Sequence, residues 1–189
     1  MHRKTQLRME LIGVPFTYAI GVLLHYSFIL SDSSILTIFF GSVNESLWEH
    51  IKVFAFPYII WSCVELAFVR KSFKKFVVAK ICGLYTLILS MILAFSAYFG
   101  FIGKYNFWVL DIIISFFLIF ISYFVSHELV ISRWHLEEFF VVAILALAVF
   151  LSMYLTFSVV PPKINFFWDY KNGIYGIPKR AYLTFRQDF

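Results

Sequence analysis

Charge and cysteine are both scarce in this chain of 189 residues. Only 14% of its residues are charged, 61% are hydrophobic, and the mean hydropathy is +0.84. A soluble domain of this length cannot bury so much apolar surface, because small domains have a large surface for their volume. The composition therefore excludes an ordinary soluble domain and predicts an integral membrane protein.

The few cysteines exclude two further classes of protein. Cys63 and Cys82 both lie inside apolar runs and form no CxxC pair, so neither a disulfide framework nor a cysteine zinc knuckle is expected. The basic residues do not interleave with aromatic residues along one face, which argues against a nucleic-acid partner. Membrane lipids are the expected partners of such a chain, and a membrane-protein partner is compatible with it.

Familiar catalytic signatures are missing as well. There is no HExxH motif, because His127-Glu128 is not followed by a histidine at the required spacing. No GxSxG nucleophile elbow and no glycine-rich phosphate loop occur. The pair Glu137-Glu138 lacks the following arginine of the glutamate-type prenyl-protein proteases. The chain thus carries none of these established signatures of membrane hydrolases.

Long apolar runs dominate what is present. They cover residues 11–30, 53–69, 76–99, 107–125 and 139–160, and each is about long enough to cross a hydrocarbon core of ~30 Å as a helix. Residues 35–40 form a shorter run that suits an interfacial or re-entrant piece. We therefore predict an all-α integral membrane bundle of about five transmembrane helices over residues 1–160.

Basic residues predict the orientation of the bundle. Nine lie before the first run, around the loop between the second and third, or between the fourth and fifth, against two on the opposite side: Arg3, Lys4, Arg8, Arg70, Lys71, Lys74, Lys75, Lys80 and Arg133 against Lys52 and Lys104. This asymmetry predicts a cytoplasmic N-terminus and an exported C-terminus. The basic tail runs against this pattern, with Lys163, Lys171, Lys179, Arg180 and Arg186 on the exported side.

The last residues, 161–189, predict a separate extracytoplasmic aromatic tail. Pro161-Pro162 ends the fifth apolar helix, since proline cannot donate the backbone hydrogen bond that a helix needs. Asn172-Gly173 stands between aromatic residues and favours a hairpin with a type I′ turn. We expect a short aromatic hairpin lying on the outer surface.

The stretch NESLWEHIK, residues 44–52, places unusual charge between two apolar runs. Ser42 with Glu45 three residues on fits a capping box, which gives Glu45 a mainly structural role. Glu49 can pair with Lys52 on the same helical face. Because Glu49 and His50 lie beyond the first turn, capping does not explain them, and they are better candidates for function.

Two more ionisable residues are expected at the same depth. His25 and Asp111 lie near the outer ends of the first and fourth apolar runs, where a charged group normally faces a partner or a water-filled cavity. We predict Glu49, His50 and Asp111 as catalytic candidates. His25, Glu45 and Glu49 are the candidate ligands of a divalent metal such as zinc. On the inner side, Glu65 is expected to snorkel or to pair with Arg70.

The string NESxWEH, with a proline soon after at Pro57, resembles a family of small multi-pass bacterial (clostridial-type) membrane proteins of unknown function. The tail resembles it too, through Pro161-Pro162, Phe167, Asp169, Gly173 and Tyr175-Gly176. The family pattern has a proline after the aspartate, where this chain has Tyr170. The resemblance implies a bacterial plasma membrane location and no particular chemistry.

Three functions are compatible with these residues. The first is a membrane-embedded, metal-dependent hydrolase of a lipid or lipid-linked substrate. The second is a small transporter or transporter partner in which Glu45, Glu49 and Asp111 relay protons or bind a cation. The third is a structural or assembly protein without turnover, whose acidic groups end in pairs and caps. The sequence leaves these alternatives open, including whether the protein is an enzyme.

Overall fold

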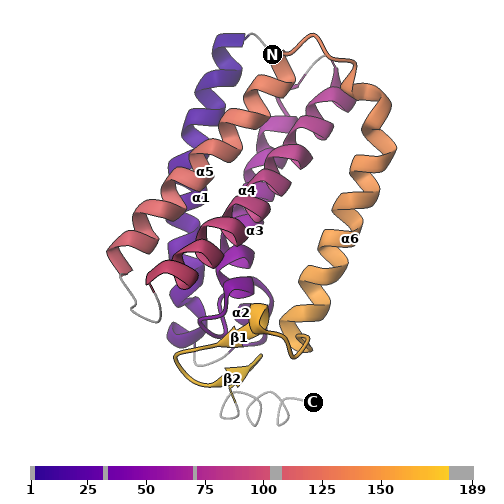
Figure 1. Cartoon of the computed structure of the whole chain (residues 1–189). Helices are drawn as coiled ribbons and strands as arrows, with labels where there is room; N and C mark the ends of the chain where they lie inside the picture. The colour runs from indigo at the N-terminus through magenta and orange to yellow at the C-terminus, as the bar shows by residue number, and fades with distance from the viewer. Residues whose placement is uncertain (1–2, 32–33, 70–71, 103–107, 179–189) are drawn as a thin grey trace.

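The computed structural model describes residues 3–31, 34–69, 72–102 and 108–178, and the side chains among them except those of residues 3, 98–102 and 108–110. Five long helices run roughly along one axis (Figure 1): α1 (Arg3–Leu30), α3 (Leu47–Leu66), α4 (Phe73–Ile102), α5 (Trp108–Ile131) and α6 (Phe140–Val159). The prediction of a mainly helical chain with a short C-terminal hairpin is confirmed.

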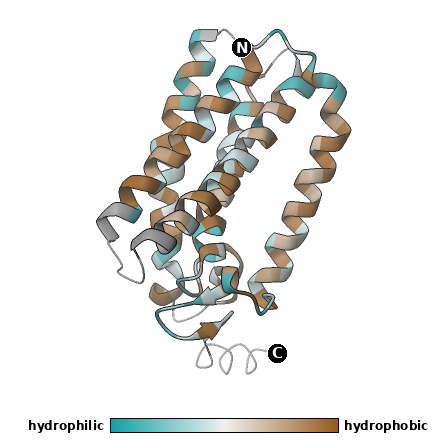
Figure 2. Ribbon diagram, in the orientation of Figure 1, coloured by the Kyte–Doolittle hydropathy of each residue, from teal (hydrophilic) through white to brown (hydrophobic). Residues whose placement is uncertain are grey.

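Four segments are long and apolar enough to cross a membrane: Lys4–Leu30, Phe73–Ala97, Asp111–Ile131 and Leu136–Val159. They match four of the predicted runs, and Figure 2 shows hydrophobic residues along most of their length. The remaining run falls in α3, which is not among the four. Glu49, Lys52 and Glu65 lower its hydropathy, and all three are buried inside the protein. A fifth crossing by α3 therefore stays a prediction.

The helices pack around α4, which contacts α3, α5 and α6, while α1 packs against α3 and α5. The most apolar stretch of α4 is 56% buried, against 17% for that of α6, so α6 lies at the edge of the bundle. Gly21 brings α1 close to α3, because an added Cβ would lie 2.3 Å from the Phe54 ring. The main core lies between these helices and includes Val14, Phe54, Leu87, Met91 and Ile119.

Short elements gather at the end of the bundle opposite the N-terminus (Figure 1). The predicted interfacial piece is α2 (Ile35–Phe40), whose Ile38 is fully buried. A 3₁₀ turn, η1 (Leu136–Phe139), leads into α6 at the other end. The end of α3, the start of α4 and the turn that joins α5 to α6 also lie at that other end, with the start of α1.

After α6, the turn η2 (Asn165–Phe167) leads to strands β1 (Trp168–Asp169) and β2 (Ile174–Tyr175), which pair antiparallel as Trp168↔Tyr175 and Asp169↔Ile174. The prediction of a type I′ turn at Asn172-Gly173 is wrong. The paired strands leave a loop of residues 170–173, and only Gly173 in it has a positive φ, of 67°. The Gly173 amide instead donates to the Asp169 carbonyl at 2.8 Å.

Of the basic residues used to predict the membrane orientation, six lie outside the described residues: Arg70, Lys71, Lys104, Lys179, Arg180 and Arg186.

Candidate functional site

The loop before α3 sets the position of every candidate residue in the NESLWEHIK stretch. The Ser42 hydroxyl donates to the Asn44 carbonyl at 2.7 Å, and the Asn44 side-chain oxygen accepts from the Ser46 amide at 2.8 Å. α3 then begins at Leu47 with Ser46 as its N-cap, accepting from the Glu49 amide at 3.5 Å. The expected cap at Ser42 is therefore wrong, and Glu45 lies ahead of the helix rather than in its first turn.

The C-terminal hairpin is hydrogen-bonded to this loop. The Asn44 side-chain amide donates to the Gly176 carbonyl at 2.9 Å, and the Glu45 backbone amide donates to Asp169 at 3.2 Å. Asp169 is fully buried and also accepts from the Lys171 and Asn172 backbone amides and from the Asn172 side chain. The sequence assigned no role to Asp169 beyond the family pattern, because Glu45, its partner outside the hairpin, is 124 residues away.

Glu49 forms a buried ion pair and is not part of the histidine group. Its Oε2 lies 2.8 Å from Lys52 Nζ and accepts the Val43 amide at 3.0 Å. Lys52 also donates to the Ile38 carbonyl at 3.0 Å and to the Ser158 hydroxyl at 3.3 Å. The predicted pairing of Glu49 with Lys52 is confirmed. This pair joins α2, α3 and α6.

His25, Glu45 and His50 come together as one group, which we call the outer group. Their ligating atoms all lie within 4.8 Å of one another. Glu45 Oε2 lies 3.8 Å from His25 Nε2 and 3.7 Å from His50 Nε2, and the two imidazole rings are 5.1 Å apart. Ligands about 2.1 Å from a tetrahedral zinc are separated by roughly 3.4 Å. The spacing in the outer group is thus close to that of a metal site.

The protonation of His50 also fits metal binding. Its Nδ1 lies 2.9 Å from the Ser46 carbonyl oxygen, which can only accept a hydrogen bond. Nδ1 therefore carries the proton, and the lone pair of Nε2 faces Glu45 and His25. Histidine ligands in metal sites are commonly held in one tautomer by such a hydrogen bond.

Two further charged residues border the outer group. Asp111, at the start of α5, is close enough to His50 and Glu45 for their charges to act on its carboxylate. Its Oδ1 is buried and has no hydrogen-bond partner within the part of the chain that the structure describes. Lys171, on the hairpin loop, lies 3.7 Å from Glu45 Oε1, and its side chain is 66% exposed.

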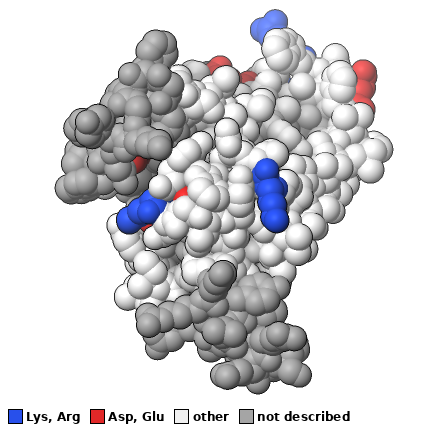
Figure 3. Space-filling model, turned by 60° about the horizontal axis from the view of Figure 1, so that its bottom comes forward, with Lys and Arg blue, Asp and Glu red and all other residues white. Residues whose placement is uncertain are grey.

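Among the described residues, few charged side chains lie on the surface around this end of the bundle. The described part of the face in Figure 3 is mostly uncharged, with a few basic and acidic side chains on it. The outer group is itself half-buried, with side-chain exposures of 21% for His25, 26% for His50 and 31% for Glu45. A ligand can therefore reach it from outside without the bundle opening.

The structure thus brings His25, Glu45 and His50 together, places Asp111 within range of their charges, and pairs Glu49 with Lys52. These features define a helical protein with several membrane-length helices and a polar group at one end. The chain belongs to the DUF6512 family, a family of unknown function whose model matches residues 1–177. No curated protein and no solved structure matches the chain.

Proposed function

We propose that the protein is a membrane-embedded, metal-dependent hydrolase of a lipid or lipid-linked substrate. The observation that supports this proposal is the outer group, in which three potential ligands from α1, the loop before α3 and α3 itself converge within 4.8 Å. Two histidines, one carboxylate and an open position form the ligand pattern of catalytic zinc sites. His50 takes the place that Glu49 had in the predicted ligand set, because Glu49 is engaged with Lys52.

The neighbouring side chains fit hydrolysis. When bound, a divalent metal would supply a Lewis acid for a carbonyl or phosphoryl oxygen. Asp111 is the candidate general base, since its carboxylate is close enough to feel the charges of the outer group and its buried Oδ1 has no hydrogen-bond partner in the described residues. Lys171 supplies a mobile positive charge at the outer edge, where an anionic headgroup would approach.

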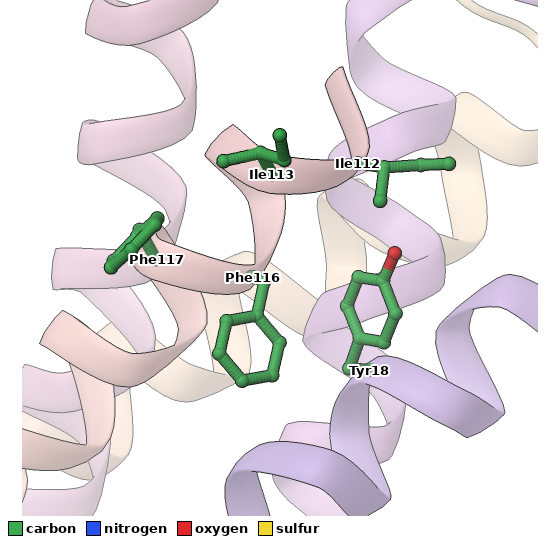
Figure 4. A pocket seen from close by; sticks show the side chains of 5 residues that line it. All are labelled: Tyr18, Ile112, Ile113, Phe116 and Phe117. Atoms are coloured by element: carbon green, nitrogen blue, oxygen red, sulfur yellow. The ribbon is translucent and has the colours of Figure 1, made fainter. Parts of the chain in front are cut away.

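A groove between α1 and α5 favours a substrate with an apolar chain. It has a volume of about 250 Å³ and is lined by Tyr18, Ile112, Ile113, Phe116 and Phe117 (Figure 4). Ile112 directly follows Asp111, and Tyr18 lies two helical turns before His25 on the same face of α1. The groove would therefore hold an apolar chain whose polar end lies near the outer group.

Location and orientation belong to the same proposal. Five crossings, with α3 as the fifth, would place the N-terminus in the cytoplasm and the outer group on the exported side of a bacterial plasma membrane. The excess of Lys and Arg at the N-terminal end supports this orientation. Active exported reporters fused after Leu30, and active cytoplasmic reporters after Lys75, are the expected results.

Metal content tests the central claim. The purified protein, loaded with zinc and freed of excess ion, should retain about one zinc per chain, and His50→Ala should lose it. His135→Ala is the matched control, because His135 is an exposed histidine at the opposite end of the bundle. Anomalous scattering should place the ion among His25, Glu45 and His50. Equal metal content in the two variants, or an ion elsewhere, would overturn the proposal.

A further inference from the structure

A second polar group lies near the other end of the bundle. We call Glu10 on α1, Glu65 on α3 and Lys80 on α4 the inner cluster. Their exposed fractions are only 2%, 0% and 4%. Lys80 Nζ lies 2.6 Å from Glu10 Oε2 and also contacts Glu65 Oε2. The expected partner of Glu65 was Arg70, which lies outside the described residues, and Lys80 takes that place.

Apart from the two carboxylates, aromatic side chains surround the Lys80 ammonium. Its ammonium lies over the rings of Tyr123, Phe76 and Tyr58, at 5.1, 5.5 and 6.0 Å from their centres. The Tyr58 hydroxyl donates to the Lys80 carbonyl, and the Tyr123 hydroxyl is hydrogen-bonded to Thr17. Close packing keeps the cluster closed, since a Cβ at Gly83 would lie 2.1 Å from the Tyr58 hydroxyl oxygen.

The charges of the inner cluster do not balance. Two ionised carboxylates and one ammonium leave a net charge of −1 on three side chains that are almost fully buried. A buried net charge is costly, and the usual remedy is that one group becomes neutral. One proton bound to one of the carboxylates removes the excess.

Hydrogen-bond chemistry decides which carboxylate takes that proton. Glu65 Oε1 accepts from Trp61 Nε1 at 2.9 Å, although that N–H also points at the Met9 carbonyl at 3.0 Å, and Glu65 Oε2 faces Lys80. Indole and ammonium groups can only donate, so neither oxygen of Glu65 faces an acceptor. Both contacts therefore favour an ionised Glu65.

Glu10 has a different environment. Its Oε2 faces Lys80, but its Oε1 lies 3.3 Å from the Ser126 hydroxyl, which can accept as well as donate. We propose that the inner cluster is a proton-binding site, in which Glu10 holds an exchangeable proton on Oε1 and donates it to Ser126 Oγ. Solvent is the source of the proton. The site is independent of the outer group, since Glu10 and His25 are separated by roughly 22 Å along α1.

Infrared spectroscopy tests for the proton directly. The wild-type protein in detergent at neutral pH should show the C=O stretch of a protonated carboxyl group, and Glu10→Gln should remove it. Asp111→Asn is the control, because Asp111 is another partly buried carboxyl, and that variant should keep the Glu10 band. A difference spectrum between wild type and Glu10→Gln without a carboxylic-acid band would overturn the proposal.

Two matched substitutions then assign the proton to one residue. Glutamine at position 10 can donate its amide hydrogen to Ser126 as the acid does, so its melting temperature should stay within about 2 °C of wild type. Glutamine at position 65 must point its NH₂ group at either Trp61 or Lys80, so Glu65→Gln should lower the melting temperature by roughly 5 °C or more. A larger loss of melting temperature in Glu10→Gln than in Glu65→Gln would place the proton on Glu65. Equal large losses would mean that both carboxylates are ionised, and either result refutes the assignment.

Discussion

Glu49→Gln separates the structural charge of the NESLWEHIK stretch from its candidate metal ligands. The substitution keeps the shape of the side chain and removes the charge opposite Lys52, whose side chain is fully buried. Breaking a buried ion pair by changing one partner commonly costs about 3–5 kcal/mol, because the other charge is left without compensation. The Ile38 carbonyl and the Ser158 hydroxyl still bind the ammonium, which favours the lower end, about 3 kcal/mol.

For a chain of this size, that loss should lower the melting temperature by roughly 6–12 °C. Thermal unfolding in detergent, followed by tryptophan fluorescence, measures it. The double variant Glu49→Gln, Lys52→Met should recover most of the lost stability, because it removes both charges. Metal content of the folded Glu49→Gln protein should stay at the wild-type level, since Glu49 is paired with Lys52 and is not part of the outer group.

Glu45→Gln is the matched comparison and should behave in the opposite way. The Glu45 side chain is 31% exposed, and exposed ion pairs contribute little, so the change in the free energy of unfolding should be below about 0.5 kcal/mol. Zinc affinity should fall at least roughly 100-fold, because loss of a ligand exceeds the effect of losing an outer partner. A stable Glu49→Gln protein that cannot bind zinc, beside a Glu45→Gln protein that can, would refute these roles.

Two other predictions concern Asp169 in the C-terminal hairpin and the binding of metal. Asp169→Asn places an amide donor against groups that themselves donate, so it should destabilise the hairpin by about 2 kcal/mol. Faster tryptic cleavage at Lys171, with cleavage near the N-terminus unchanged, would show that loss, and equal rates would contradict it. Zinc binding should weaken on acidification from about pH 7.5 to about pH 5.5, because histidine must lose a proton before it can bind metal. Isothermal titration at both pH values tests this, and equal affinities would exclude histidine ligands.

The helices of this protein are the part that the sequence predicts well. Membrane-length apolar runs and the short run at residues 35–40 depend on local composition, and the structure has helices at each of them. The hairpin is predictable for the same reason, from proline, asparagine and glycine close together. Its loop length is not, because the four hydrogen bonds that converge on Asp169 decide where the strands stop pairing.

The start of α3 shows why local patterns mislead within the site. Ser42 with Glu45 and Ser46 with Glu49 have the same spacing, so a capping pattern cannot choose between them. Long-range contacts decide between them, because the hairpin binds the Asn44 side chain and the Glu45 backbone amide and keeps this segment out of the helix. Glu45 is thereby released from a capping role and turned toward the histidines.

The sequence does not show how each helix is rotated about its own axis, and contacts between helices could therefore not be predicted. Lys80 counted only as one more basic residue on the inner side, yet it faces two carboxylates on other helices. Nothing in the spacing along α4 indicates that partner, because Glu10 is 70 residues away in sequence. Pairing within one helix, as between Glu49 and Lys52, can be read from a sequence, whereas pairing across a bundle needs the packing.

The separation of the two polar groups bears on the choice between enzyme and transporter. A transporter that relays protons from the outer group to the inner cluster needs a polar path between them. The described core between the two is mostly apolar, with Val14, Phe54, Met91 and Ile119 at most 7% exposed. Thr17 and Tyr123 extend the inner cluster by one hydrogen bond towards this layer, and Ser115 on α5 is a buried polar residue nearer the outer group. An ion or proton would meet few polar partners in this layer and would bear much of the cost that desolvation imposes. A site that works from one face, on a substrate arriving from the lipid or the outer surface, avoids that cost, and this favours the hydrolase.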